Sequence, residues 1–173
     1  ARQGGKIKRK KYDGKIWCVI VKNKNFLIER NGKYLFSGNT DEVFGPAPQG
    51  VYFKENDSFK PSNPYAASKA AADMLCLAFF ASYGLPVIVS RGVNTMGPCQ
   101  YPEKMIPLFI TNALRDEPLP LYGDGRQVRD WIHVLDHCEA IDLALRNGRA
   151  GEIYNLGASN EHHNIEIVER ILD

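Results

Sequence analysis

The stretch NPYAASKAAADMLCLAFFASYGLPVIVSR (Asn63–Arg91) predicts a helix over residues 64–83 that leads into a buried strand. Asn63 is a common helix cap, Pro64 suits the first helical position, and Gly84 is a typical residue after the last turn. The segment LPVIVSR is continuously apolar before its last two residues, which is typical of a strand covered on both faces in a parallel sheet. The stretch therefore predicts a helix packed against a parallel sheet.

Tyr65 and Lys69 lie four residues apart near the start of this helix, so they share one helical face. An ammonium group near a phenol favours the phenolate and lowers its pKa, which would make Tyr65 a usable general base. The Tyr-x-x-x-Lys spacing is weak by itself, because most pairs of this kind are solvated helix surface.

Strand and helix patterns alternate on both sides of this stretch, which predicts an α/β layered fold with a parallel sheet. We expect one helix opened by Pro102 and disturbed by Pro107, and another with Asp136 and Glu139 as a capping box and Gly148 as its stop. The other expected strands are YLFSG, VRDWIHV and EIYNLG, and the last expected helix is NIEIVERILD.

The first 33 residues differ from the rest in charge. They carry 11 basic and two acidic side chains, a net charge of +9, whereas residues 34–173 carry −7. IWCVIV reads as a strand, and Asn31-Gly32 predicts a hairpin turn. We therefore divide the chain into a small basic β-rich segment, 1–33, and an α/β region, 34–173.

Composition limits the class of protein. A hydrophobic content of 44% and a charged content of 24% predict a packed core. No apolar run reaches the ~20 residues that span a membrane, and the N-terminus lacks the apolar core of a secretion signal. The four cysteines are widely scattered, which favours reduced thiols and a cytoplasmic location.

The histidines offer a metal site as an alternative. His133 and His137 have helical zinc spacing, but His133 is expected to end a strand and Asp136 to cap the next helix, so the two would not share a face. His162 and His163 are interpreted as exposed loop residues. We expect no metal.

Thr40, Asp41 and Glu42 follow a predicted strand 25 residues before Tyr65. Sheets of this kind bind ligands at the carboxyl ends of their strands. Adjacent carboxylates in unlike surroundings can divide acid and base roles between them. The alternative is a polar turn whose Asp caps the next element.

Several segments together resemble the dTDP-glucose 4,6-dehydratase family of the extended short-chain dehydrogenase/reductase superfamily. The resemblance covers residues 34–173 and implies a partial Rossmann-like parallel sheet. It rests on TDEVFG, NPYAASKAAAD, LPVIVSR, YPEKMIPLFITNAL, LPLYGDGRQVRDWIHVLDHCEAI and GEIYNLGASNEHHNIEIV, which occur in this order.

The resemblance implies an NAD-dependent dehydration of a nucleoside-diphosphate hexose, with thymidine and uridine sugars both open. Tyr65, tuned by Lys69 and near Thr40, would take the proton of the sugar 4-hydroxyl while hydride passes to NAD. Glu42 would remove the hydrogen on carbon 5, and Asp41 would protonate the departing 6-hydroxyl. The hydride would then return to carbon 6.

Further positions carry over from the same resemblance. Tyr65, Lys69 and Asn94 match positions that bind the cofactor. Asn39 and Met96 stand where the family usually has Ser and Tyr, and Thr95 stands where it has an Asn expected to touch substrate. The positions that match substrate-binding residues are Thr95, Lys104, Pro120, Tyr122, Arg129 and Asn164.

The family's Gly-x-x-Gly-x-x-Gly turn, which holds the NAD pyrophosphate at a helix N-terminus, does not occur in the sequence. We therefore expect a middle-to-late fragment of the family, and whether it binds NAD or is active alone stays open. The resemblance also implies a homodimer through helix 64–83. From the composition and the charge pattern we expect neither a membrane nor a nucleic acid as partner. The alternatives are a binding module with a polyanion-binding basic N-terminus and an inactive remnant that keeps the dimer helix.

Overall fold

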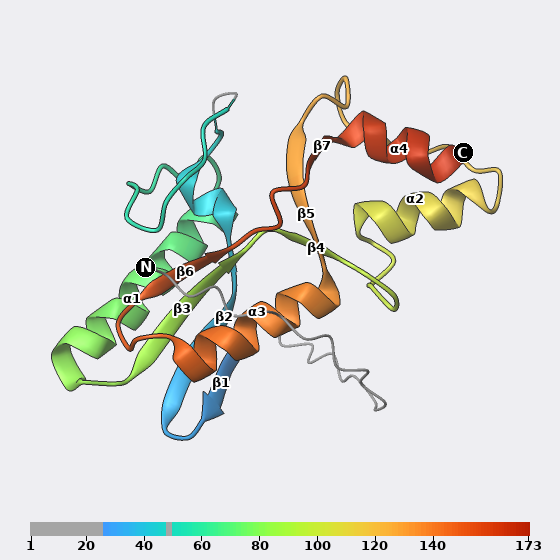
Figure 1. Cartoon of the computed structure of the whole chain (residues 1–173). Helices are drawn as coiled ribbons and strands as arrows, with labels where there is room; N and C mark the ends of the chain where they lie inside the picture. Colours follow the sequence, from blue (N-terminus) through green and yellow to red (C-terminus); the bar gives the residue numbers. More distant parts are fainter. Residues whose placement is uncertain (1–25, 48–49) are drawn as a thin grey trace.

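The computed structural model describes residues 26–47 and 50–173 (Figure 1). The predicted strand IWCVIV lies outside the described residues. Sheet A contains β1 (Phe26–Arg30), β2 (Lys33–Thr40), β3 (Val87–Gly92) and β6 (Ile153–Leu156) in the order β1-β2-β3-β6. Strands β2, β3 and β6 are parallel, and β1 pairs antiparallel with β2. The predicted α/β fold with a parallel sheet is confirmed.

The hairpin between β1 and β2 turns at Asn31 and Gly32, as predicted. Their φ angles of 52° and 73° are the left-handed values that a two-residue hairpin loop of this type requires. The carboxylate of Glu29 accepts a hydrogen bond from the Gly32 amide at 2.8 Å. The hairpin spans the expected boundary between 1–33 and 34–173, and the division itself stays a prediction.

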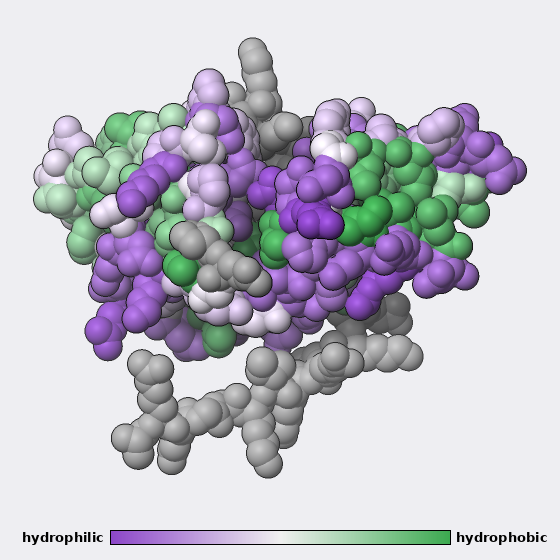
Figure 2. Space-filling view, turned by 90° about the horizontal axis from the view of Figure 1, so that it is seen from above, coloured by the Kyte–Doolittle hydropathy of each residue, from purple (hydrophilic) through white to green (hydrophobic). Residues whose placement is uncertain are grey.

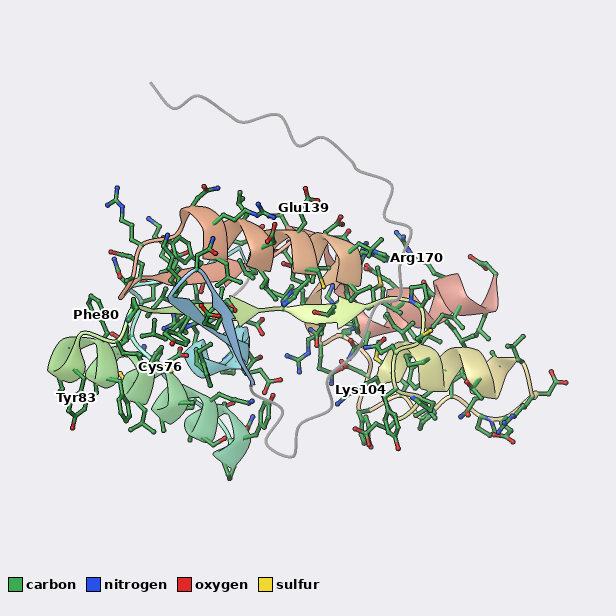
Figure 3. All side chains as sticks on the ribbon, turned by 90° about the horizontal axis from the view of Figure 1, so that it is seen from below. Cys76, Phe80, Tyr83, Lys104, Glu139 and Arg170 are labelled. Atoms are coloured by element: carbon green, nitrogen blue, oxygen red, sulfur yellow. The ribbon has the colours of Figure 1, made fainter. Side chains whose placement is uncertain are left out.

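Helix α1 (Pro64–Tyr83) has the predicted bounds. The Asn63 side chain accepts a hydrogen bond from the Ala66 amide at 2.8 Å, and Gly84 ends the helix with a left-handed φ of 67°. Helices α1 and α3 (Val134–Asn147) cover opposite faces of sheet A (Figure 3). Each face has its own buried cluster. One contains Leu35, Ile88, Ala144 and Leu145, and the other contains Val43, Phe44 and Ala70.

A second lobe holds a smaller sheet, beside the first in Figure 1. It contains β4 (Asn94–Met96), β5 (Val128–His133) and β7 (Glu161–His163), with α2 (Met105–Ala113) and α4 (Asn164–Leu172) packed together. Strand β5 pairs parallel with β4 and antiparallel with β7. His162 and His163 therefore belong to a strand and are half-buried, so their interpretation as exposed loop residues was wrong.

Helix α2 begins at Met105, three residues after Pro102, so Pro102 does not open it. Pro107 is the third residue of the helix. An amide in the first turn has no intrahelical acceptor, so a proline there removes no hydrogen bond. The expected disturbance at Pro107 was wrong for this reason.

Helix α3 follows β5 without a loop. His133 Nδ1 accepts a hydrogen bond from the Leu135 amide at 3.3 Å, so His133 is the cap and Asp136 lies inside the first turn. The predicted capping box at Asp136 was wrong, whereas the predicted end at Gly148 is confirmed. In residues 26–47 and 50–173, no group of three His, Cys, Asp or Glu side chains is arranged to hold a metal ion.

The surface seen from above is mainly polar over its centre, with an apolar area over the second lobe (Figure 2). The second lobe exposes Ile110, Leu114 and Leu172. Within the described part of the chain, no helix combines the length and the apolar character that crossing a bilayer would require.

We expect Asn63→Ala to lower the free energy of unfolding by about 1 kcal/mol, because the Ala66 amide loses its acceptor. Urea denaturation followed by circular dichroism measures the change. Ser62→Ala, one residue before the cap, is the matched control and should leave stability within about 0.5 kcal/mol of wild type. Equal losses in both variants would contradict the role of the cap.

Candidate active site

The carboxyl end of β2 leads directly into the short 3-10 helix η1 (Asp41–Phe44). Thr40 Oγ1 accepts a hydrogen bond from the Glu42 amide at 3.3 Å and donates one to Asp41 Oδ1 at 3.1 Å. The hydroxyl group thus fixes the start of η1, which is the capping role that small hydroxyl residues commonly have. Its two contacts hold the two carboxylate residues in a defined turn beside the parallel strands.

Burial raises the pKa of Asp41 above its ordinary value of 3.8. The Thr40 hydrogen bond and the positive charge of Arg129 lower the same pKa, but their effects are smaller. Desolvation disfavours the charged carboxylate, so Asp41 keeps its proton to higher pH than an exposed aspartate. The effect of Arg129 also connects the second lobe to this carboxyl group.

Tyr65 lies in the first turn of α1 and is 46% exposed, whereas Lys69 is buried on the same helical face. The Lys69 Nζ atom lies over the Tyr65 ring, 5.3 Å from its centroid. Burial raises the pKa of Tyr65 above 10.0, and the carboxylates of Glu42 and Asp41 raise it further. The predicted lowering of this pKa by Lys69 was therefore wrong for the protein alone. The spacing of Tyr65 and Lys69 along one helix could not reveal this effect of two carboxylates from another element.

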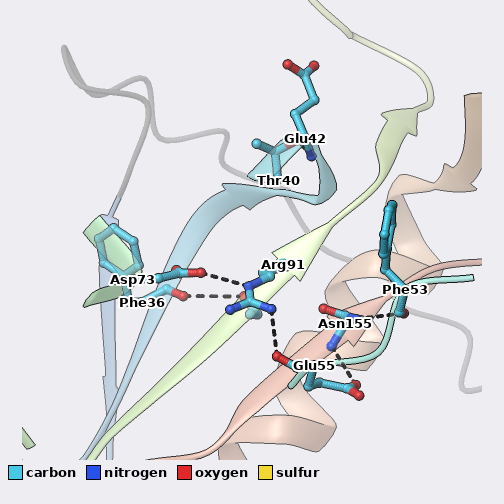
Figure 4. A network of polar contacts seen from close by, with 9 residues as sticks. Phe36, Thr40, Glu42, Phe53, Glu55, Asp73, Arg91 and Asn155 are labelled. Atoms are coloured by element: carbon cyan, nitrogen blue, oxygen red, sulfur yellow. Dashed lines mark hydrogen bonds and ion pairs between the residues drawn. The ribbon is translucent and has the colours of Figure 1, made fainter. Parts of the chain in front are cut away.

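A buried arginine, which the sequence reasoning missed, joins the elements of this site (Figure 4). Arg91 Nε donates to Asp73 Oδ2 at 2.7 Å, and Arg91 Nη1 donates to the backbone carbonyl of Glu55 at 3.1 Å. Glu55 Oε1 in turn accepts from the Asn155 amide at 3.0 Å, and the Asn155 side chain donates to the Phe53 carbonyl at 3.2 Å. The sequence did hold a signal for this role, because Arg91 is a charged residue at the end of the apolar segment LPVIVSR.

Thr95, the position expected to touch substrate, lies in β4 with its Oγ1 3.5 Å from His137 Nδ1. The His137 ring packs so closely on Gly92 that a Cβ atom there would overlap it. Burial lowers the pKa of His137, which favours the neutral imidazole. Asn94 lies one residue before Thr95, and its Nδ2 is 3.4 Å from the Asp130 carbonyl.

The other predicted substrate positions lie in the second lobe. Lys104 directly precedes α2 and forms an exposed ion pair with Glu103 at 3.5 Å, Tyr122 is 85% exposed, and Pro120 is also exposed. Asn164 begins α4, and its buried Oδ1 has no hydrogen-bond partner among the described residues. Among these positions, Arg129 is linked to the acidic turn, because its positive charge lowers the pKa of Asp41.

The structure thus brings Thr40, Asp41, Glu42, Tyr65 and Lys69 together at the carboxyl end of sheet A. Hydrogen bonds join the first three, the side chains of Tyr65 and Lys69 are in contact, and the η1 carboxylates act on the phenol. A buried carboxyl group, a second carboxylate and a phenol can divide proton transfers among themselves. The arrangement is suited to acid–base chemistry.

Comparison with known proteins agrees with this geometry. The chain is 53% identical over 133 residues to a dTDP-glucose 4,6-dehydratase from Xanthomonas campestris, which covers 77% of the chain and 38% of the relative. A dTDP-glucose 4,6-dehydratase from Bacillus anthracis, solved in complex with NAD, has a TM-score of 0.75 and 55% identity, over 78% of the chain and 43% of that structure. The Streptomyces venezuelae enzyme, solved with NAD and TYD bound, also has a TM-score of 0.75, with 49% identity over 78% of the chain and 42% of that structure.

The chain therefore spans about two fifths of the length of these relatives. Residues 25–157 match the NAD dependent epimerase/dehydratase family, and this range covers more than half of the sequence. The parallel sheet and the grouped carboxylates and phenol are consistent with that match. This chain belongs to the NAD-dependent epimerase/dehydratase family.

Proposed function

We propose that this chain carries the proton-transfer groups of an NAD-dependent dehydration that converts dTDP-glucose to dTDP-4-keto-6-deoxyglucose. The observation that carries the proposal is the grouping of Thr40, Asp41 and Glu42 with the Tyr65–Lys69 pair, at the carboxyl end of a parallel sheet. Relatives named dTDP-glucose 4,6-dehydratase support the choice of reaction and of substrate.

The proposed roles follow from the chemistry of each side chain. Tyr65 takes the proton of the sugar 4-hydroxyl, with Lys69 beside its ring and Thr40 at the same strand end. Glu42 removes the hydrogen on carbon 5, which becomes acidic once carbon 4 is a ketone. Asp41 gives its proton to the departing 6-hydroxyl, so that water leaves. The raised pKa of Asp41 supports this role, because a general acid must still hold its proton when it acts.

NAD, when bound, supplies the hydride acceptor and donor for this chemistry and brings a positive charge to the site. The nicotinamide end of NAD fits the groups present, since a phenol, an ammonium group and an amide come from Tyr65, Lys69 and Asn94. The sequence has no Gly-x-x-Gly-x-x-Gly turn for the pyrophosphate. A test of activity must therefore provide that half of the cofactor site separately.

The substrate side of the site is assigned to the second lobe. Arg129 suits a diphosphate because its planar guanidinium group can donate to two phosphate oxygens. The exposed Tyr122 ring can stack on a pyrimidine base. Asn164 Oδ1, which has no hydrogen-bond partner within residues 26–47 and 50–173, can accept a hydrogen bond from a base or sugar. Lys104, Pro120 and Thr95 complete the proposed substrate positions.

We also propose that the protein is a cytoplasmic homodimer that pairs through α1. The outer face of this helix exposes Met74, Leu75, Phe79 and Tyr83, and Figure 3 shows Tyr83 directed away from the sheet. A cluster of this kind favours contact with another apolar surface. The four cysteines are widely scattered along the sequence, which supports a reducing compartment.

Catalysis is tested by mixing the chain with a separately expressed N-terminal half that carries the glycine-rich motif, plus NAD and dTDP-glucose. We expect formation of the 4-keto-6-deoxy product, and a loss of at least 100-fold in kcat for Glu42→Gln because the base is removed. Glu139→Gln, an exposed glutamate on α3 labelled in Figure 3, is the control and should retain full activity. Absence of product from the complemented wild type would overturn the proposal.

The raised pKa of Asp41 predicts how stability depends on pH. Folding favours the protonated carboxyl group, so the contribution of Asp41 is fully present below about 3.8 and is lost as pH rises through its folded pKa. We expect Asp41→Asn to be more stable than wild type at pH 7, and the gain to vanish near pH 3. Urea denaturation across pH measures it, with the exposed Asp136→Asn as control. A loss of stability at pH 7 would contradict the prediction.

The dimer is tested by sedimentation. We expect wild type to sediment as a dimer and Leu75→Glu/Phe79→Glu to sediment as a monomer, because two carboxylates would be buried in an apolar contact. Leu143→Glu alters a leucine of similar exposure, 57% against 61% for Leu75, on the opposite face of sheet A and should remain dimeric. A monomeric wild type would exclude pairing through α1.

A further inference from the structure

Arg91 is the buried centre of a contact set that joins four segments of the chain. It lies near the end of β3, between Asn39 of β2 and Asn155 of β6, and only 1% of it is exposed. Its Nε contacts Asp73 of α1 at 2.7 Å, and its Nη1 contacts the Glu55 carbonyl at 3.1 Å (Figure 4).

Two aromatic rings complete this environment. The Arg91 Cζ atom lies 4.9 Å from the Phe44 ring centroid and 4.7 Å from that of Phe59. Phe44 belongs to η1, whereas Phe59 lies in the segment that leads into α1. A guanidinium group over aromatic rings is attracted by their electron density, more strongly when water is excluded.

These contacts connect the two elements that carry the reactive groups. Phe44 follows Glu42 by two residues in the same four-residue turn. Asp73 follows Lys69 by four residues, so both lie on one face of α1 and both are buried. Arg91 thus contacts both the turn that carries the η1 carboxylates and the helix that carries Tyr65.

We infer that Arg91, through Asp73 and Phe44, is a positioning residue that holds the carboxylates of η1 beside Tyr65. The inference rests on the proposed function for its catalytic meaning, although the placement itself can be measured without activity. Lysine at this position would keep the charge but lose the planar group that contacts two rings and two oxygen acceptors.

The test measures the ionisation of Tyr65 by ultraviolet titration. Subtracting the curve of the same protein with Tyr65→Phe isolates this phenol among eight tyrosines. In Arg91→Lys we expect the Tyr65 pKa to fall toward its ordinary value of 10.0, because the carboxylates of Glu42 and Asp41 are no longer held close. In the complemented enzyme the same variant should lose about 100-fold in kcat with little change in KM, as for a displacement of about 1 Å.

A double variant tests the same role if Arg91→Lys fails to fold. Arg91→Met with Asp73→Leu removes both charges together, and apolar replacement of a whole buried ion pair is commonly tolerated. The control is Arg146→Met with Asp142→Leu, an ion pair of 2.6 Å on the outside of α3, which should leave the Tyr65 titration unchanged.

The outcomes separate the inference from the proposed function. A Tyr65 titration that is unchanged in the folded Arg91 variants would overturn the positioning role, whatever the activity. Loss of the fold in both variants, seen by circular dichroism, would also overturn it, since Arg91 would then be needed for folding itself. A shifted titration in a protein that forms no product even when complemented would support the positioning role and reject the dehydratase function.

Discussion

The ion pair between Arg91 and Asp73 is the interaction on which the arrangement of the first lobe depends. Both side chains are almost fully removed from water, and they join a central strand to the helix that covers it. Removing one partner of a buried pair typically costs about 3–5 kcal/mol, because the remaining charge has no water around it. An arrangement of the strand, the helix and the segment around Glu55 that separated this pair would carry a cost of the same kind. That arrangement sets the geometry of the site.

The elements that sequence reasoning located correctly are those specified by neighbouring residues. Asn63, Pro64 and Gly84 define the ends of α1 because capping and left-handed termination depend on a few adjacent positions. Asn31 and Gly32 specify a hairpin turn for the same reason. The position of Thr40, Asp41 and Glu42 at the carboxyl end of the sheet was predictable because these residues end or directly follow a parallel strand.

The features that sequence reasoning missed depend on residues far apart along the chain. Asp73 and Arg91 are 18 residues apart on different elements, so no local spacing indicates that they pair. Burial and the η1 carboxylates raise the pKa of Tyr65, an effect that its spacing from Lys69 along the helix could not predict. The start of α3 was misplaced because β5 passes into the helix with no loop, and a histidine supplies the cap. Catalytic roles are likewise determined by tertiary placement.

A single residue, Val93, separates β3 of sheet A from β4 of the second sheet. Its amide donates to the Leu156 carbonyl at 3.3 Å, so even this residue is tied to β6. An extended chain has almost no slack along its length, since each residue already spans about 3.3 Å. The lobes therefore cannot separate along this strand, and the direct passage from β5 into α3 joins them a second time. A ligand in contact with both lobes would therefore meet two surfaces whose separation the backbone already fixes.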